Sequence, residues 1–266
     1  MDWEPMVAPS STSVAVQVAP IAEILGVPVS RITMTGAIAA IRRTIEAGQA
    51  QYVCVRDVHG IMRAVEDPAM MAIQRGAGLV TPDGMPLVWI AKARGFDDIS
   101  RVSGADLMET LCDATQDTGI GHFFYGGREG VAERLITLLQ ERLPGLSVAG
   151  HYCPPFRALT PVEDENVVHN IRNSGARIVW VGISTPKQEF WMRDHVGRLP
   201  GVTLIGVGAA FDFHAGMVKR APRWMQERGL EWLHRLASEP RRLWRRYLII
   251  APQFVFHVIL ESIRRR

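Results

Sequence analysis

The segment RIVWVGISTPKQE (residues 177–189) holds the two signals that decide the fold. Residues 177–181 form a short, mostly apolar run that is typical of a buried strand. A helix is expected to begin at Pro186, because proline is favoured in the first helical turn. Passage from an apolar strand through a short polar turn into a helix is the repeating unit of an α/β fold.

The same alternation extends in both directions along the chain. We expect further strands at residues 51–55, 78–80, 122–125, 146–149 and 202–207, and helices at residues 35–46, 67–75, 86–94, 104–115, 130–142 and 163–173. This order predicts an α/β, Rossmann-like fold, in which a mainly parallel sheet is flanked by helices on both faces. Ligands bind beyond the carboxyl ends of the strands in such sheets.

The 266 residues suit one large α/β domain with an appendage. Residues 1–26, which begin with a stretch rich in Ser, Pro and Val, are expected to form an N-terminal arm. The strand pattern occupies a core of residues 27–215. Residues 216–266 are helical in pattern, basic and rich in tryptophan, so we place a domain boundary before them.

Charge is distributed unevenly along the chain. From Ala215 onward there are 12 Lys and Arg against 4 Glu, about +8, whereas the remainder carries about −5. A basic appendage on an acidic body predicts an anionic partner. The alternatives are nucleic acid, anionic lipid and a phosphorylated substrate.

An uncharged run of 14 residues, 247–260, lies near the C-terminus between two groups of arginines. A spanning helix needs about 20 apolar residues. We therefore expect a helical membrane-associating appendage that lies in the interface, with packing against the core or self-association as the alternative.

Two patterns that the sequence lacks, a disulfide framework and a secretory signal, indicate the cellular compartment. The three cysteines, Cys54, Cys112 and Cys153, are scattered, which favours a reducing compartment. The opening MDWEPMVAPSSTS lacks a basic region followed by an apolar one, so a secretory signal is not expected. We expect a cytoplasmic protein.

Asp83 is the candidate catalytic residue. It stands in TPDGMP (residues 81–86), after an expected strand and before an expected helix. A carboxylate there can take a proton from an attacking hydroxyl group as a general base. The alternative is an Asp-Gly turn that caps the helix.

Other candidate substrate- or nucleotide-binding residues lie near expected strand ends: Arg101, Gly126, Gly127, Tyr152, Lys187, Gln188 and Asp212. A Gly-Gly pair lets backbone amides approach a phosphate, although it is neither a Walker loop nor a dinucleotide fingerprint, and a tight turn remains the alternative. Arginine and lysine bind phosphate, or are solvated surface residues. Asp212 stands in an apolar stretch, where a carboxylate is costly unless it is paired or used.

No metal-ligand pattern is present in the sequence. There is no Asp-x-Asp, no His-x-x-x-His and no cysteine cluster, so we expect no metal site and no cofactor. A diphosphate leaving group would then be neutralised by arginines, a lysine and helix dipoles.

Taken together, several segments resemble the WecG/TagA/CpsF family of glycosyltransferases, placed in glycosyltransferase family 26. They are PDGMPLVW (82–89), RVSGADL (101–107), FFYGG (123–127), VGISTPKQE (181–189), GVGAAFDF (206–213), KRAP (219–222), EWLHRL (231–236) and EPRRL (239–243). The resemblance covers about residues 27–247, and residues 1–26 have no clear match.

The resemblance implies an inverting, metal-independent transfer from a UDP-sugar to a saccharide on a polyprenyl diphosphate carrier, in exopolysaccharide or other cell-surface polysaccharide biosynthesis. It implies that Asp83 is the base and that Arg101, Gln188 and Asp212 line the same pocket. The appendage would hold the enzyme peripherally on the inner face of the plasma membrane. Its arginines would lie over the acceptor diphosphate, with Arg235, Arg242 and Arg245 as the best matches. A homo-oligomer is possible.

One segment departs from the family pattern. Many members carry Thr and Asn near the pocket, where this chain has RDVHG (residues 56–60). A hexose donor therefore fits at least as well as the acetamido sugar of the best-known members.

Two other functions compete with this interpretation. One is a non-catalytic, nucleotide-binding regulatory protein whose basic tail binds nucleic acid. The tail interleaves arginines with tryptophans and long aliphatic residues, which favours a lipid interface over nucleic acid. The other is a dehydrogenase, but the chain lacks Gly-x-Gly-x-x-Gly after its first strand.

Overall fold

The computed structural model describes residues 19–264 and confirms the expected α/β fold. Six strands form one sheet in the order β4-β3-β8-β7-β5-β6, and all neighbouring strands are parallel. The strands are β3 (Gln51–Arg56), β4 (Leu79–Pro82), β5 (Gly121–Gly126), β6 (Val148–Tyr152), β7 (Ala176–Gly182) and β8 (Thr203–Gly206). Their carboxyl ends therefore meet at one edge of the sheet.

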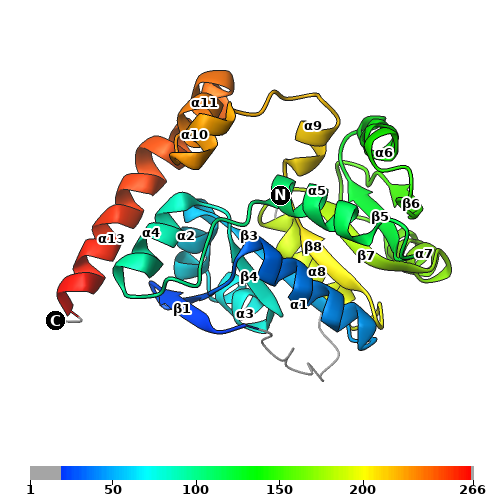
Figure 1. Cartoon of the computed structure of the whole chain (residues 1–266), viewed down its shortest axis with the longest axis horizontal. Helices are drawn as coiled ribbons and strands as arrows, with labels where there is room; N and C mark the ends of the chain where they lie inside the picture. The colour runs from blue at the N-terminus through cyan, green and yellow to red at the C-terminus, as the bar shows by residue number, and fades with distance from the viewer. Residues whose placement is uncertain (1–18, 265–266) are drawn as a thin grey trace.

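Helices cover both faces of this sheet (Figure 1). One buried cluster includes residues of α1 (Met34–Glu46), α5 (Gly104–Thr115), α6 (Val131–Arg142) and α9 (Ala210–His214). The other includes residues of α2 (Val58–Glu66), α3 (Pro68–Gly76), α4 (Met85–Ala93), α7 (Pro161–Asn173) and α8 (Lys187–Val196). Successive strand side chains point to opposite faces. Ile178 and Trp180 of β7 accordingly belong to the first cluster, and Val179 and Val181 belong to the second.

A small hairpin precedes the sheet and was not expected from the sequence. Strands β1 (Ile21–Ile24) and β2 (Val27–Ser30) pair in antiparallel register, joined through Leu25 and Gly26, which both have positive φ. Ser30 accepts a hydrogen bond from the backbone of Val80 at 3.0 Å, which fastens the hairpin to the core. Of the expected arm, residues 1–18 lie outside the described residues. Residues 21–24 are a strand, and four residues are too short for a periodic signal.

Two further details differ from the sequence expectation. Helix α2 begins directly after β3, where only a strand end was expected, because Asp57 caps it by accepting a hydrogen bond from the Gly60 amide at 3.0 Å. Strand β6 begins two residues later than expected and extends to Tyr152. It is an edge strand with mostly half-buried residues, so its apolar pattern is weak.

After β8 the chain forms α9 and then the appendage, residues 216–264. The appendage contains α10 (Arg223–Glu227), α11 (Glu231–Ser238) and one long helix. The long helix is continuous through α12 (Pro240–Arg245), the π-helical segment η1 (Arg246–Ile250) and α13 (Ala251–Arg264). In Figure 1 it runs beside α2 and α4, with α10 and α11 at its upper end.

The long helix is docked on the core by one of its sides. Leu243 and Phe254 are 4% and 2% exposed. Glu261 forms an ion pair with Arg94 at 2.6 Å and accepts a hydrogen bond from the Leu25 amide at 3.4 Å. The appendage is therefore part of the folded molecule rather than a free tail.

A buried ion pair joins the sheet to α8. Arg56, the last residue of β3, is 1% exposed and lies 2.8 Å from a carboxylate oxygen of Glu189, which is completely buried. Arg56 also donates to Gln74 at 2.9 Å, and Thr185 donates to Glu189 at 3.1 Å. The pair fixes the end of β3 against the first turn of α8.

We expect that Glu189→Gln destabilises the protein by about 3–5 kcal/mol, because it leaves the Arg56 charge buried without a counterion. Urea unfolding followed by circular dichroism measures the change. Glu109→Gln is the matched control, since Glu109 is half exposed in its pair with Arg142, and it should cost about 1 kcal/mol or less. Equal losses of unfolding free energy in the two variants would show that breaking the buried pair costs no more than breaking an exposed one.

Candidate active site

Asp83 lies at the carboxyl end of β4 and contacts Arg101, which precedes α5. The Arg101 guanidinium donates to the Asp83 carbonyl oxygen at 2.6 Å and to its carboxylate at 3.3 Å. The Asp83 amide donates to the Arg56 carbonyl oxygen at 2.7 Å, which fixes the segment against β3. Two candidates that are 18 residues apart in sequence are thus direct partners.

The surroundings of Asp83 make it a stronger base than an ordinary aspartate. Its side chain is 33% exposed, so the carboxyl group reaches the solvent although other elements crowd it. Burial raises the pKa of Asp83, and the nearby carboxylates of Asp57 and Glu231 raise it further, whereas Arg101 and Arg246 lower it. A carboxylate with a raised pKa accepts a proton more readily, and it loses this capacity as the pH falls through that pKa.

The appendage contributes three charged side chains near Asp83. Glu231, at the start of α11, lies 2.6 Å from Arg101. Its other carboxylate oxygen lies 3.7 Å from Arg220, a residue between α9 and α10. Arg246 pairs with Asp57, and despite burial this contact holds the pKa of Asp57 well below its ordinary value. Core and appendage together form the charged surroundings of Asp83.

Gln188 and the two glycines lie at the ends of the central strands. Gln188 is 3% exposed and accepts a hydrogen bond from the Gly208 amide at 3.1 Å. A Cβ atom on Gly126 would lie 2.6 Å from the backbone of Gly182, so only glycine fits there. The Gly127 amide donates to the Gly182 carbonyl oxygen at 3.1 Å. That amide is engaged in the turn, and its contact with a phosphate stays a prediction.

The remaining core candidates have neighbours other than Asp83. Asp212 in α9 is 34% exposed and 3.6 Å from Arg128. Lys187, the first residue of α8, is exposed. Tyr152 ends β6 and stacks on Tyr125 with 5.9 Å between ring centroids. Because β6 and β4 are opposite edges of the sheet, their ends are about 24 Å apart at roughly 4.8 Å per strand.

The three appendage arginines expected over the acceptor diphosphate have other side chains as neighbours in this structure. The Arg235 guanidinium lies 5.3 Å from the ring centroid of Phe213. Arg242 is exposed and pairs with Glu239, and Arg245 is exposed and lies 5.8 Å from the ring centroid of Trp244. A diphosphate contact by these three arginines therefore stays a prediction.

Sequence reasoning missed four charged residues of the site: Asp57, Arg220, Glu231 and Arg246. The position of Arg246 follows from helical periodicity once the docked side of the long helix is known. It lies three residues after the buried Leu243 and eight before the buried Phe254, and these spacings place it on the docked side of the helix. Arg245 is turned away from that side by the same periodicity, because it lies two residues after Leu243.

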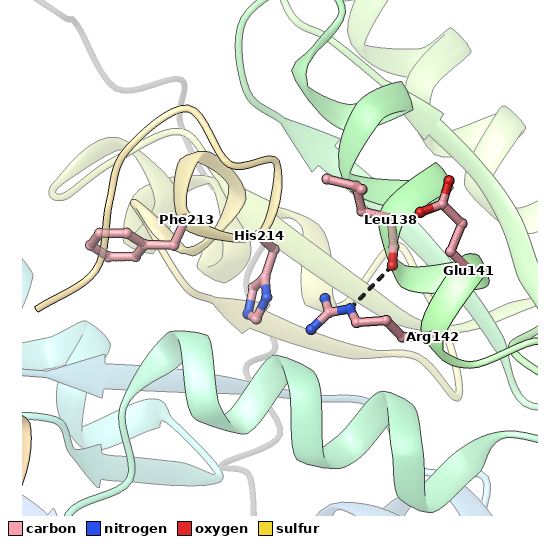
Figure 2. Close-up of a pocket in the computed structure, with 5 residues that line it drawn as sticks. All are labelled: Leu138, Glu141, Arg142, Phe213 and His214. Atoms are coloured by element: carbon pink, nitrogen blue, oxygen red, sulfur yellow. Dashed lines mark hydrogen bonds between the residues drawn. The ribbon is translucent and has the colours of Figure 1, made fainter. Parts of the chain in front are cut away.

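A separate hollow of about 230 Å³ lies between α6 and α9 and is lined by Leu138, Glu141, Arg142, Phe213 and His214. Figure 2 shows these side chains, with the Arg142 guanidinium donating to the Leu138 carbonyl oxygen at 3.1 Å. The hollow contains none of the candidate site residues. It is therefore not the site around Asp83.

Paired arginines and carboxylates surround Asp83. Within residues 19–264, no group of three or more His, Cys, Asp or Glu side chains is arranged to hold a metal ion. Arg101, Arg220, Arg235 and Arg246 lie on or beside the elements that enclose Asp83.

Comparison with known proteins shows the family of the chain. A relative from Bacillus spizizenii, named N-acetylglucosaminyldiphosphoundecaprenol N-acetyl-beta-D-mannosaminyltransferase, is 33% identical over 197 residues. The match covers 74% of this chain and 74% of the relative. The sequence model of the Glycosyl transferase WecG/TagA/CpsF family matches residues 22–266, which include both the core and the appendage. The chain therefore belongs to the WecG/TagA/CpsF family of glycosyltransferases.

Proposed function

We propose that this glycosyltransferase moves a sugar from a UDP-sugar onto a saccharide linked to polyprenyl diphosphate, with inversion and without a metal ion. The observation that carries the proposal is the Asp83 carboxylate at the carboxyl end of β4. It is partly exposed, has a raised pKa and is oriented by Arg101. These are properties of a general base for a hydroxyl nucleophile.

The proposed reaction is a single displacement. An acceptor hydroxyl oxygen attacks the anomeric carbon, and its proton passes to Asp83 while the bond from that carbon to the UDP oxygen breaks. The electron pair of the broken bond leaves with UDP. Attack from the side opposite the leaving group inverts the anomeric configuration.

The leaving UDP gains negative charge that the site must stabilise. Arg101 lies beside the base, and Lys187 begins α8, whose N-terminus carries a partial positive charge. Guanidinium groups bind phosphate oxygens in a bidentate manner. We assign the metal-free stabilisation of the diphosphate to these groups and to the appendage arginines.

The proposed acceptor follows from the relative and from the appendage. The name of the Bacillus spizizenii relative specifies a saccharide linked through diphosphate to undecaprenol. A lipid of that kind stays in the bilayer, so an enzyme that uses it must work at the membrane surface. We therefore propose a peripheral location on the cytoplasmic face of the membrane, in exopolysaccharide or other cell-surface polysaccharide assembly.

The long helix of the appendage carries the membrane contact in this proposal. Its 25 residues, Pro240–Arg264, are long and apolar enough to cross a membrane by length and composition. This length exceeds the 14-residue run on which the sequence expectation rested. An open apolar stripe runs along it, formed by Leu248, Val255, Phe256, Ile259 and Ile263, each 54–65% exposed.

Docking of the helix favours an interfacial position over a spanning one. Phe254 and Glu261 fasten its other side to the core, as described above. A spanning helix would have to leave these contacts. A helix with one side on the protein and an apolar stripe on the other fits the headgroup boundary, where the flanking arginines meet anionic lipid.

We consider two kinds of donor sugar for this chain. The relative transfers N-acetylmannosamine according to its name. In this chain, Arg56 forms the buried ion pair with Glu189, and Asp57 forms an ion pair with Arg246. Both side chains are therefore already engaged within the protein. These residues stand where many family members carry Thr and Asn, so a hexose is the second donor that we include in the assay.

We expect Asp83→Asn to lower turnover by roughly 10²–10⁴-fold, because the acceptor hydroxyl loses its proton acceptor. UDP release is measured with UDP-hexoses and UDP-N-acetylmannosamine on undecaprenyl-diphosphate-linked N-acetylglucosamine in detergent, and UDP binding should persist. Asp97→Asn, on an exposed loop residue, is the control and should keep full activity. Near-normal turnover of Asp83→Asn with saturating substrates would remove Asp83 from the role of base.

We expect full activity after treatment with EDTA, because arginine and lysine side chains neutralise the diphosphate in the proposed mechanism. The same UDP-release assay measures this before and after chelation and after added Mg²⁺ or Mn²⁺. Complete loss that either cation restores would contradict the proposed metal independence.

We expect the double substitution Phe256→Asn and Ile259→Asn to weaken binding to anionic phospholipid vesicles by about tenfold or more, since two apolar side chains no longer enter the interface. Vesicle cosedimentation measures the bound fraction. The matched control is Phe156→Asn with Val162→Asn, because these apolar residues are even more exposed but lie on the core. Equal losses in both variants would place the membrane contact elsewhere.

A further inference from the structure

Glu231 bridges two arginines at the side of the site where core and appendage meet. One carboxylate oxygen lies 2.6 Å from Arg101, and the other lies 3.7 Å from the Nε atom of Arg220. The side chains of Glu231, Arg101 and Arg220 are 14%, 18% and 21% exposed. A phosphate group bridged by two guanidinium groups would present its oxygens in the same way.

Each arginine also has a carboxylate on the core. Arg101 contacts Asp83, and Arg220 contacts Asp106 at 2.5 and 2.8 Å and donates to Ser103 at 3.2 Å. The cluster therefore contains two positive and three negative side chains when all are ionised. A further anion could not enter without strong repulsion unless one carboxylate left.

Glu231 is the carboxylate that can leave. Asp106 is held by Ser103 at 2.6 Å and stands in the first turn of α5, and Asp83 is fixed by its backbone contact with Arg56. For Glu231 the structure records only Arg101 and Arg220 as partners within residues 19–264. When it leaves, the remaining charges balance, and both arginines keep a core carboxylate that orients them.

We propose that Glu231 is an internal stand-in for a diphosphate, and that it occupies the anion site of Arg101 and Arg220 until a substrate diphosphate displaces it. The Nε atom of Arg220 has no hydrogen-bond partner in the described structure, so the site has an unused donor. The inference rests on the proposed function for the identity of the ligand and deepens it by adding Arg220 and an exchange step.

Displacement frees α11 while the long helix stays in place. The long helix keeps Arg246 on Asp57, the buried Phe254 and the Glu261–Arg94 pair. Helix α11 contains no buried residue, and the ring contacts that hold it are those of Trp232 with Tyr247 and of Arg235 with Phe213. Binding of a diphosphate therefore frees the first turn of α11 from Arg101 and Arg220 and opens that side of the site.

Calorimetric titration of the full-length protein with inorganic pyrophosphate tests the site without any sugar transfer. Glu231→Gln should bind pyrophosphate about tenfold more tightly than the unchanged chain, since the competing charge is gone, and Arg220→Gln should bind it about tenfold more weakly. Glu227→Gln, an exposed residue of α10, is the matched control for net charge and should change the affinity by less than about twofold. Unchanged or weaker binding by Glu231→Gln would overturn the proposal.

A second measurement needs no substitution. Hydrogen exchange of the unchanged protein at saturating pyrophosphate should become faster in residues 231–238 and stay the same in α13. Slower exchange in residues 231–238 would show that Glu231 remains bound, and it would refute displacement even if the variants fold poorly.

The source of the diphosphate is decided by repeating the titrations with UDP and with farnesyl diphosphate. A tighter complex of Glu231→Gln with UDP alone assigns the site to the donor, and one with farnesyl diphosphate alone assigns it to the acceptor. A response to neither overturns the assignment to a substrate diphosphate. Because none of these titrations requires turnover, they stand apart from a failure of the proposed transferase reaction.

Discussion

The Arg101 guanidinium is shared between Asp83 of the core and Glu231 of the appendage, and the organisation of the site depends on this contact. Its Nε atom donates to the Asp83 carbonyl oxygen, and its Nη2 atom donates to the carboxylates of both Asp83 and Glu231, the first residue of α11. A guanidinium can serve both carboxylates because its donors are arranged as a rigid fork. Core and appendage are thereby joined at the site itself, which a lysine in place of Arg101 could not achieve with the same geometry.

The strand ends beneath this contact are fixed by the buried pair of Arg56 and Glu189. Such a pair contributes little net stability but is costly to break, so it specifies an arrangement more than it strengthens the fold. Arg56 precedes Asp57, the partner of Arg246, and Glu189 follows Gln188, which accepts a hydrogen bond from the Gly208 amide. One buried pair therefore sets the positions of Asp57 and Gln188 at the carboxyl ends of the strands. The charges of the site itself remain partly exposed, where they can exchange partners.

The sheet and the position of Asp83 at a strand end were predictable from sequence because their signals are local. An apolar run followed by a polar turn and a helix marks a strand end whatever lies elsewhere in the chain. Glu231 and Arg246 were missed because their partners are 130 and 189 residues away, and the side of a helix that docks cannot be known before the core is built. The β1–β2 hairpin and the weak edge strand β6 were missed or shifted because short or half-exposed strands have little hydrophobic pattern.

The appendage combines two roles that share one geometry. Along Pro240–Arg264, residues that dock on the core and residues that stay open alternate with the helical period, so the helix presents one apolar side to the protein and another outward. Because Arg246 lies on the docked side, the helix that we propose to meet the lipid also brings a positive charge to Asp57 beside Asp83. In our proposal a lipid-linked diphosphate reaches the base only at the membrane surface. A helix that binds this surface and completes the charged site in the same docked position would couple acceptor capture to catalysis without a separate moving domain.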